Sequence, residues 1–206
     1  MDNCAYSDRV PGVELSSPAD LPPAFRSALA GLSAVKLRPE VVVQELPAPQ
    51  RLAPYAIALH ATAMSGQEEI AEGRLVLLHD PAGQEVWDGD TRCVAYIQAE
   101  VDAEIASDPM LAGVGWSWLI EALDSAGAEY AAEGGTVTRT TSERFGALTD
   151  HPVSCDVEIR ASWSPSGDLG PHLMAFGEVL CVAAGLPPIP PGVVQIPKRR
   201  LARRAR

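Results

Sequence analysis

The sequence predicts an α+β domain with a single, mainly antiparallel sheet and three helices packed mainly on one face. Two observations predict this class. Several segments alternate apolar and polar residues, as half-buried strands do, and most of them are joined by short connections that favour antiparallel pairing. Three other segments repeat apolar residues at helical spacing. The expected order is one helix, three to five strands, a second helix, two strands and a third helix.

Composition and local signals divide the chain into three parts. Residues 1–19 mix polar side chains with Pro and Gly, which predicts a disordered N-terminal segment. Residues 20–190 are expected to form the single domain, and residues 191–206 an extended, Pro-containing and basic C-terminal tail. Apolar residues make up 47% of the 206 residues and charged residues 21%, so the chain is long and apolar enough to bury a core.

The three helices are expected where apolar residues recur every three or four positions and Gly or Pro follows. The third segment has so few polar residues that its helix is expected to be buried all round or to face a partner chain. The first helix is expected between Asp20 and Pro39, the second over about residues 114–126, and the third between Asp168 and Gly185.

The strands are expected where alternation or β-branched runs occur. Residues 67–72 are polar and are expected to form a loop, and Asp80–Gly83 has the pattern of a type I turn. A short return strand is expected through Val86 and Trp87. The main strands are expected over residues 40–46, 55–61, 74–79, 92–102 and 155–163.

The segment 136–145 is the expected partner of the last strand, but its alternation is broken. Val137 shares one parity with Arg139 and Glu143, so a hairpin that buries this face would bury charge. A β-bulge could turn the charged residues to water, where they would pair with residues 156–160. Alternatively, Arg139 with Arg144 and Arg160 could form a polar pocket for an anionic ligand or an acidic partner side chain. The sequence leaves both explanations open.

Charge is distributed unevenly along the chain. The formal net charge is −11, with 16 basic and 27 acidic residues. Because six of the basic residues lie in the last nine positions, the rest of the chain carries 10 basic residues against 27 acidic ones. That part should repel nucleic acid and anionic membranes. Nucleic-acid contact is expected only through the tail residues Lys198, Arg199, Arg200, Arg203, Arg204 and Arg206.

No motif indicates a metal, a cofactor or a catalytic nucleophile, and we expect none of them. The four Cys residues lack CxxC spacing, and the four His residues lack HxH or HExxH spacing. Cys155 lies near His151 in sequence, but its parity favours a packed thiol over a catalytic pair. Scattered free thiols are typical of a reducing cytoplasm, and we expect neither a signal peptide nor a membrane span.

Several stretches of the sequence resemble one uncharacterised family. They are residues 37–42, 48–56, 73–84, 114–119, 158–163 and 184–188. In these stretches the chain resembles the actinobacterial domain of unknown function 3000, over about residues 20–195. The resemblance implies a cytoplasmic single-domain protein without an established activity, and it assigns no functional residues. The order of elements is also loosely similar to secretion-chaperone-like folds, which dimerise and bind other proteins, although the additional strand departs from that order.

The leading hypothesis is a non-catalytic cytoplasmic binding protein, an adaptor or chaperone-like protein that acts as a homodimer. The third helix is expected to supply one apolar contact, and the other expected contact residues are Trp116, Trp118, Arg139, Glu143, Arg144 and Arg160. One alternative is a small-molecule enzyme without a recognisable motif, which would need His60 or His79 to converge with Asp80, Asp88, Glu143 or Cys155. The other is a nucleic-acid-associated protein that uses the basic tail.

Overall fold

The protein is a two-layer α+β structure, as the sequence predicts. The computed structural model describes residues 21–49 and 51–187. In these ranges six strands form one antiparallel sheet in the order β1-β2-β3-β4-β6-β5. The strands are β1 (Val41–Leu46), β2 (Tyr55–Ser65), β3 (Glu68–Gln84), β4 (Gly89–Glu100), β5 (Glu129–Ser142) and β6 (Ser154–Ser166); the helices are α1 (Pro23–Ala34), α2 (Ala103–Ser107), α3 (Leu111–Ser125) and α4 (Gly170–Ala183).

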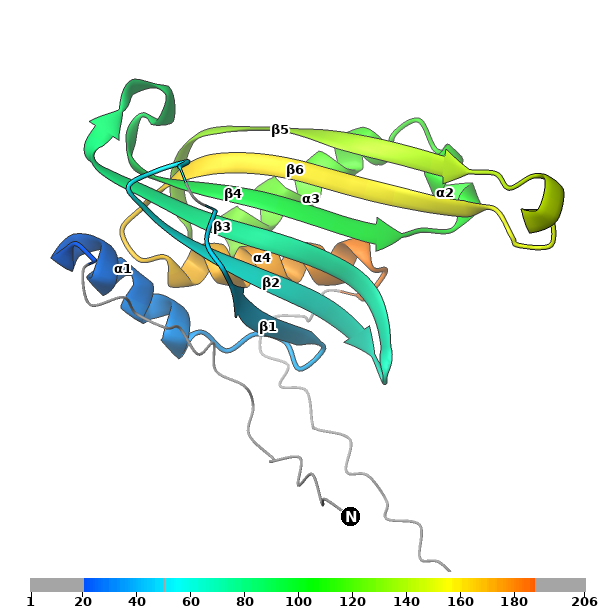
Figure 1. Ribbon diagram of the computed structural model, residues 1–206, viewed down its shortest axis with the longest axis horizontal. Helices are drawn as coiled ribbons and strands as arrows, with labels where there is room; N and C mark the ends of the chain where they lie inside the picture. Colours follow the sequence, from blue (N-terminus) through cyan, green and yellow to red (C-terminus); the bar gives the residue numbers. More distant parts are fainter. Residues whose placement is uncertain (1–20, 50, 188–206) are drawn as a thin grey trace, which may run out of the picture.

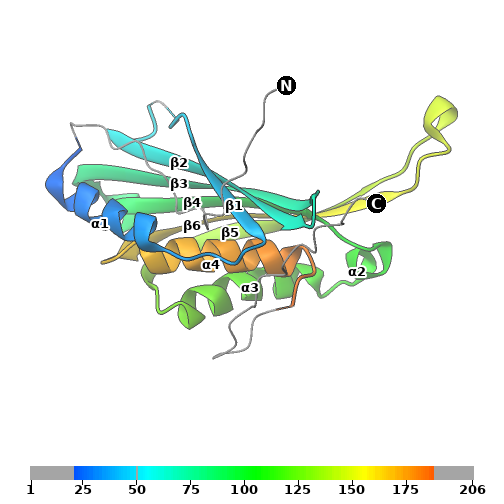
Figure 2. The same cartoon turned by 90° about the horizontal axis from the view of Figure 1, so that it is seen from below.

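All four helices lie on the same side of the sheet (Figures 1 and 2). We call that side the covered face and the other side the open face. Helix α4 lies between α1 and α3 and contacts β2, β3 and β4. Most of its residues are buried within the single chain, whereas Met174 is exposed, and the alternative that this apolar helix faces a partner chain stays a prediction. The Asp168 carboxylate accepts the backbone N–H of Gly170, but the N-cap residue of this helix is Leu169, one position later than Asp168.

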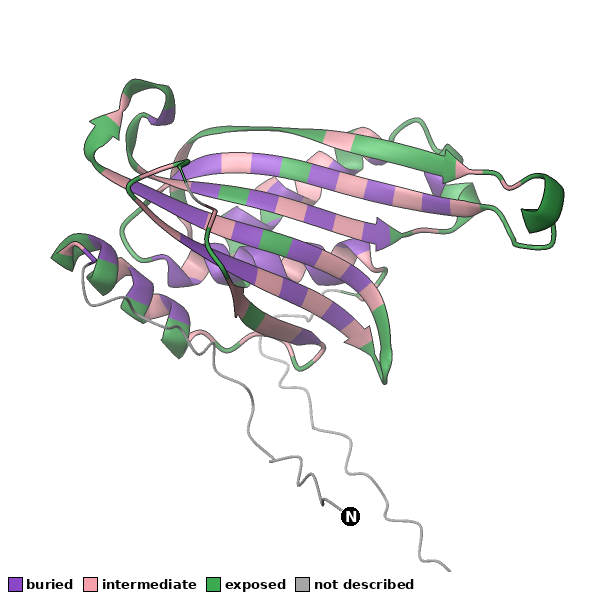
Figure 3. Cartoon of the chain, viewed as in Figure 1, coloured by how far each residue is buried: buried purple, intermediate pink, exposed green. Residues whose placement is uncertain are grey.

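The core lies between the covered face and the helices, and strand alternation builds it. Figure 3 shows buried residues alternating with more exposed ones along the central strands. In β6, Val157, Ile159 and Trp163 are almost wholly buried, as the sequence pattern predicts. Two glycines let helices approach the sheet closely. A Cβ at Gly73 would lie 2.9 Å from the Phe176 ring, and one at Gly135 would lie 2.8 Å from the Trp116 ring.

The structure corrects three details of the predicted elements. Residues 68–72 are strand, because β3 continues its pairing with β2 almost to the hairpin turn at Gly66. Residues 80–83 lie within β3 as an irregularity in its pairing with β4, and the expected return strand is a 3-10 turn, Glu85–Trp87. The short helix α2 was not predicted. The N-terminal segment 1–19, Asp20 and the basic tail lie outside the described residues, so those expectations stay predictions.

Candidate functional site

The pairing of β5 with β6 decides where Arg139 points. The register is regular from Gly134 to Ser142, and its irregularity lies earlier, between Ala131 and Gly134. Arg139 therefore pairs with the buried Val157 and lies on the covered-face side at the sheet edge. The bulge explanation is wrong at this position. The Arg139 guanidinium donates to the carbonyl oxygens of Ala106, at 3.4 Å, and Asp108, at 2.6 Å.

The other charged residues of that hairpin lie at its far end. Arg144 donates to the Pro152 carbonyl and, at 3.1 Å, to the Ser154 hydroxyl, so it ties the two arms of the hairpin together. Glu143 follows the end of β5 and is exposed. The connection between β5 and β6, which follows Ser142, projects beyond the helices that cover the centre of the sheet (Figure 1).

The two tryptophans of α3 are half-buried and pack against the core. Trp116 lies under Gly135, and Gly115 on the same helix receives Val137, which is 3.1 Å from the site of a glycine Cβ. These contacts hold α3 beneath β5. Trp116 and Trp118 therefore contribute packing within the chain, whatever further contact their exposed parts make.

Arg160 lies on the open face, opposite to Arg139. It pairs across the sheet with Tyr96 on one side and Thr136 on the other. Its guanidinium lies over the Tyr96 ring, 5.5 Å from the centroid, and its Nε is 2.8 Å from the Glu158 carboxylate. The structure thus separates the predicted arginines into three places and does not form one anion pocket from them.

Three rows of side chains cross the open face, and the sequence analysis did not bring them together. Each row follows the strand register, so its members are cross-strand neighbours about 5 Å apart. The apolar row is Ala58, Val76 and Val94. The second row, which we call basic after its arginines, is His60, Arg74, Tyr96 and Arg160. The third row, which we call acidic after its glutamates, is Glu72, Gln98 and Glu158.

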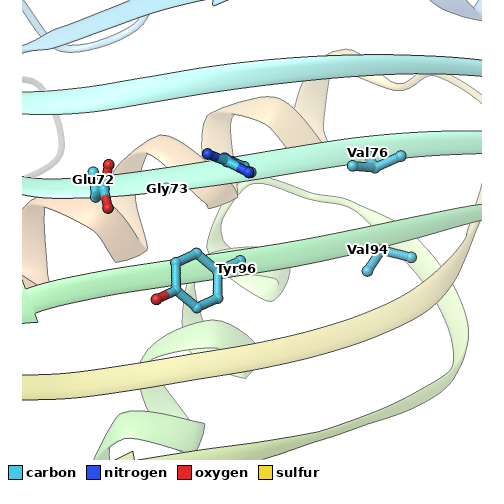
Figure 4. A pocket seen from close by; sticks show the side chains of 6 residues that line it. Glu72, Gly73, Val76, Val94 and Tyr96 are labelled. Carbon is cyan, nitrogen blue, oxygen red and sulfur yellow. The ribbon is translucent and has the colours of Figure 1, made fainter. Parts of the chain in front are cut away.

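Two adjoining depressions lie along these rows. The first, of about 420 Å³, is lined by Glu72, Arg74, Val76, Val94 and Tyr96 together with Gly73 (Figure 4). The second, of about 500 Å³, shares Val94 and Tyr96 and continues over β6 to β5. We call the two together the sheet groove. Its size is in the range of ligand sites, but it is an open trough and not a closed pocket.

Tyr96 is the centre of the groove and is fixed by hydrogen bonds. Its hydroxyl donates to Gln98 Oε1, at 2.8 Å, and lies 3.1 Å from Glu158 Oε2. Burial, and then the Glu158 carboxylate, raise the pKa of this phenol. The hydroxyl therefore stays protonated, and Tyr96 lines both depressions.

The arginines of the open face differ in how far they are engaged. Arg92 is bound by Ser162 Oγ at 2.8 Å, Ser164 Oγ at 3.0 Å and the Ala132 carbonyl at 2.8 Å. Its bond to the Ala132 carbonyl links β5 to β4 across β6. Arg74 is exposed and makes no hydrogen bond or ion pair with another residue of the described ranges. Its guanidinium is available to a carboxylate brought by a ligand.

The signal for this site was present in the sequence. Val94 and Tyr96 lie on the polar parity of β4, between Arg92 and Gln98. A valine and a tyrosine on the solvent side of an amphipathic strand are a weak signal, because single apolar residues are common on protein surfaces. Val94 keeps 37% of its surface exposed.

In the described residues, His60, His79 and Cys155 contact residues other than those that the enzyme hypothesis names, and His79 also lies 3.9 Å from the Asp90 carboxylate. His60 meets Glu72 at 3.3 Å on the open face, and buried His79 meets Thr91 at 3.0 Å. Cys155 is buried and contacts Thr141. Burial raises the pKa of the Cys181 thiol to about 12, which keeps it protonated and unreactive.

A small hollow of about 160 Å³ adjoins His79, between α1 and the sheet. Phe25 is one of the residues that line it, and its ring stacks on the imidazole with 4.8 Å between centroids. The His79 ring therefore joins α1 to the sheet. Across the described residues, no group of three or more His, Cys, Asp or Glu could hold a metal ion. None of the described helices has the length and hydropathy needed to cross a membrane.

Comparison with known proteins gives one family and no further relative. No curated protein and no solved structure matches the sequence. One family model does match, that of "Protein of unknown function (DUF3000)", and it spans residues 21–194. The matched range contains every helix and strand described above. The chain therefore belongs to the DUF3000 family of proteins of unknown function.

Proposed function

We propose that the protein is a non-catalytic binding protein that holds an extended segment of another protein in the sheet groove. The observation that supports this is the pair of adjoining depressions that meet at Val94 and Tyr96 on the face away from the helices. An open trough suits a chain that lies across strands better than a small molecule, which needs most of its surface enclosed.

The chemistry of the rows defines the segment. Val76 and Val94 offer a surface for an apolar side chain, and Tyr96 adds an aromatic ring beside them. Arg74, next in the basic row, offers a charge-assisted hydrogen bond to a carboxylate. The acidic row would repel further negative charge on its side. We therefore propose a segment with an acidic residue next to an apolar or aromatic one, and not a polyanion such as nucleic acid.

An adaptor or chaperone-like role fits this proposal, since the protein would hold a segment without transforming it. Action as a homodimer in the cytoplasm is part of the same proposal. The buried free thiols Cys93, Cys155 and Cys181 are consistent with a reducing compartment. The nucleic-acid alternative is tested separately, by asking whether deletion of residues 198–206 abolishes salt-sensitive binding to DNA.

The test uses peptides selected for binding to the intact protein from a random 12-residue library. Recovered peptides should share an acidic residue beside an apolar one. Arg74→Glu should lower their affinity at least about tenfold, because it replaces attraction by repulsion in the groove. Lys36→Glu reverses an exposed charge beyond the end of α1 and should leave the affinity within about twofold. Equal losses in the two variants would refute the proposal.

Catalysis is the second candidate, and the His60–Glu72 contact beside the groove favours it. A histidine next to a carboxylate can act as a general base. If the protein is an enzyme acting on bound peptides, their mass should change on incubation, and His60→Gln should stop the change. Peptides that bind and are recovered with unchanged mass would support the non-catalytic function.

A further inference from the structure

The two edges of the sheet are protected to very different degrees. Edge strand β1 has only six residues, and Pro39, Pro47 and Pro49 flank it. Edge strand β5 has 14 residues and contains no Pro or Lys. Proteins usually shorten, charge or interrupt exposed edges, because an edge presents a row of unpaired backbone donors and acceptors. Within the described residues, β5 has a neighbour only on its β6 side.

The side chains of β5 favour pairing with an identical strand. From Gly134 to Ser142 the strand is regular and carries only one charged residue, Arg139. Its threonines at 136, 138 and 140 lie on the open face, and Thr136 can form a favourable cross-strand pair with Thr136 of a second copy. The acidic surface of the chain is therefore interrupted along this edge, and two copies can approach here without strong repulsion at close range.

We infer that β5 pairs antiparallel with β5 of a second copy of this chain, about a two-fold axis at Thr136. The resulting sheet would be continuous across the dimer. This register places Thr136 opposite Thr136 of the second copy and Gly135 opposite Val137. It also brings Glu133 of each copy next to Arg139 of the other. From Gly134 to Thr138 the pairing needs no change in the backbone, because either set of outward groups on an antiparallel strand can form the new ladder.

Charge favours this register over an axis at Arg139. Arg139 is exposed and lies on the covered-face side of the strand, and Glu133 is exposed in the irregular stretch just before Gly134. A two-fold axis at Arg139 would put two guanidinium groups opposite each other. The axis at Thr136 instead gives two pairs of opposite charge. Exposed pairs add little affinity, but they fix register and partner choice.

The helix layer supplies the apolar part of the same interface. Trp116 lies directly beneath Gly135, next to the proposed axis, and is half-buried in the single chain. Ile120 follows one turn later on the same flank of α3 and is also half-buried. Gly113, one turn before Trp116 on that flank, is exposed with open space around it. Each α3 can thus approach α3 of the second copy, with Trp116 near the centre.

The dimer would also enlarge the sheet groove. Gly134, Gly135 and Thr136 line the second depression at the β5 edge. A two-fold axis perpendicular to the sheet keeps both open faces on the same side. The two grooves would then meet at Thr136, and one bound segment could cross from copy to copy. This consequence rests on the proposed function, whereas the strand pairing does not.

A disulfide test measures the register directly. In a Cys4→Ser background, Thr136→Cys should form a disulfide-linked dimer under mild oxidation, because equivalent residues on the axis lie about 5 Å apart. Thr138→Cys places the thiols about 13 Å apart and should not cross-link. Gln44→Cys, at the β1 edge, is the control for collisions. Cross-linking at 138 or 44 in preference to 136 would overturn the inference.

Light scattering tests dimerisation through the β5 edge without the need for oxidation. The wild-type protein should have twice the 21.8 kDa chain mass. Thr136→Lys puts two like charges at the axis and should give the monomer mass with an unchanged far-UV spectrum, since residue 136 is exposed. Gln44→Lys should stay a dimer. A monomeric wild type, or a dimer that persists in Thr136→Lys, would contradict the inference. Whether the protein binds peptides, as a dimer or as a monomer, tests the segment-binding part of the proposed function independently.

Discussion

The two faces of the sheet are built from the same strands, but one face packs against the helices and the other forms the candidate binding surface. On β3, Leu75 and Leu77 are wholly buried under α4. Arg74 and Val76, which alternate with them along the strand, line the sheet groove. On β4, Ile97 is in the core and its neighbour Tyr96 is at the centre of the groove. Odd-numbered positions of these strands therefore stabilise the fold, and even-numbered positions form the candidate binding surface.

This separation has a physical origin in the side-chain period of a strand. Successive residues point to opposite faces, so one face can be optimised for packing without affecting the other. The covered face is close-packed down to Gly73, where no Cβ fits beneath Phe176. The open face instead has threonines, charges and two partly exposed valines, which pack loosely and leave room for a ligand.

The largest expected difference between the faces is in stability. Leu75→Ala should lower the free energy of unfolding by about 2–5 kcal/mol, because it removes a buried side chain and leaves a cavity under α4. Val76→Thr, the next residue, should change it by less than about 1 kcal/mol, since that side chain is part-exposed on the open face. Urea denaturation of both variants measures the two values. Equal losses would mean that both faces are packed.

Acid should weaken the covered side through His172. This residue is fully buried, and its Nδ1 accepts the Trp163 indole N–H at 3.0 Å. Burial lowers its pKa from 6.5 to about 4, which means that the folded state resists protonation. Its neutral form therefore stabilises the fold above pH 6.5, and this contribution is lost as the pH falls from 6.5 through 4.

The expected loss from this one group is roughly 3 kcal/mol by pH 4. His172→Gln keeps an acceptor for Trp163 but cannot titrate. The difference in unfolding free energy between the two proteins should change over this pH window and be constant above it, as measured by denaturation at each pH. A constant difference from pH 7 to pH 4 would show that His172 is not buried in its neutral form.

A smaller contrast concerns the two arginines that sit on opposite faces of the β5–β6 pair. Arg139→Ala should cost about 1 kcal/mol, because the guanidinium binds two carbonyl oxygens at the end of α2. Arg160→Ala should cost less than about 0.5 kcal/mol, because the Arg160 side chain is largely in solvent. Thermal unfolding of the two variants side by side resolves the difference. A larger loss of stability in Arg160→Ala than in Arg139→Ala would contradict this assignment.

Much of this fold was predictable because alternation and helical spacing report burial directly. The alternation of residues 155–163 predicted the buried side of β6, and the apolar third helix proved to be the buried α4. The start of β3 was missed because residues 68–72 extend beyond most of the helix layer and carry three glutamates. Helix α2 was missed because its five residues are too few to show a period.

The candidate site was only partly predictable. The sequence analysis predicted Arg160 as a contact residue, but placed it in one pocket with Arg139. Sequence spacing alone does not say which face of an edge strand is turned to the helices. The break in the pattern at Arg139 proved to be an anchor for α2. The residues that line the groove come from β3, β4, β5 and β6, so only the strand order could bring them together.

The most direct test of the account compares two valines of nearly equal exposure. Val94, in the sheet groove, is 37% exposed, and Val114, on α3, is 40% exposed. Peptides selected on the wild-type protein should lose at least about tenfold in affinity for Val94→Lys, because the lysine fills the groove and replaces an apolar contact. They should bind Val114→Lys as they bind the wild type. Undiminished binding to Val94→Lys, with loss in Val114→Lys, would contradict the assignment of the open face.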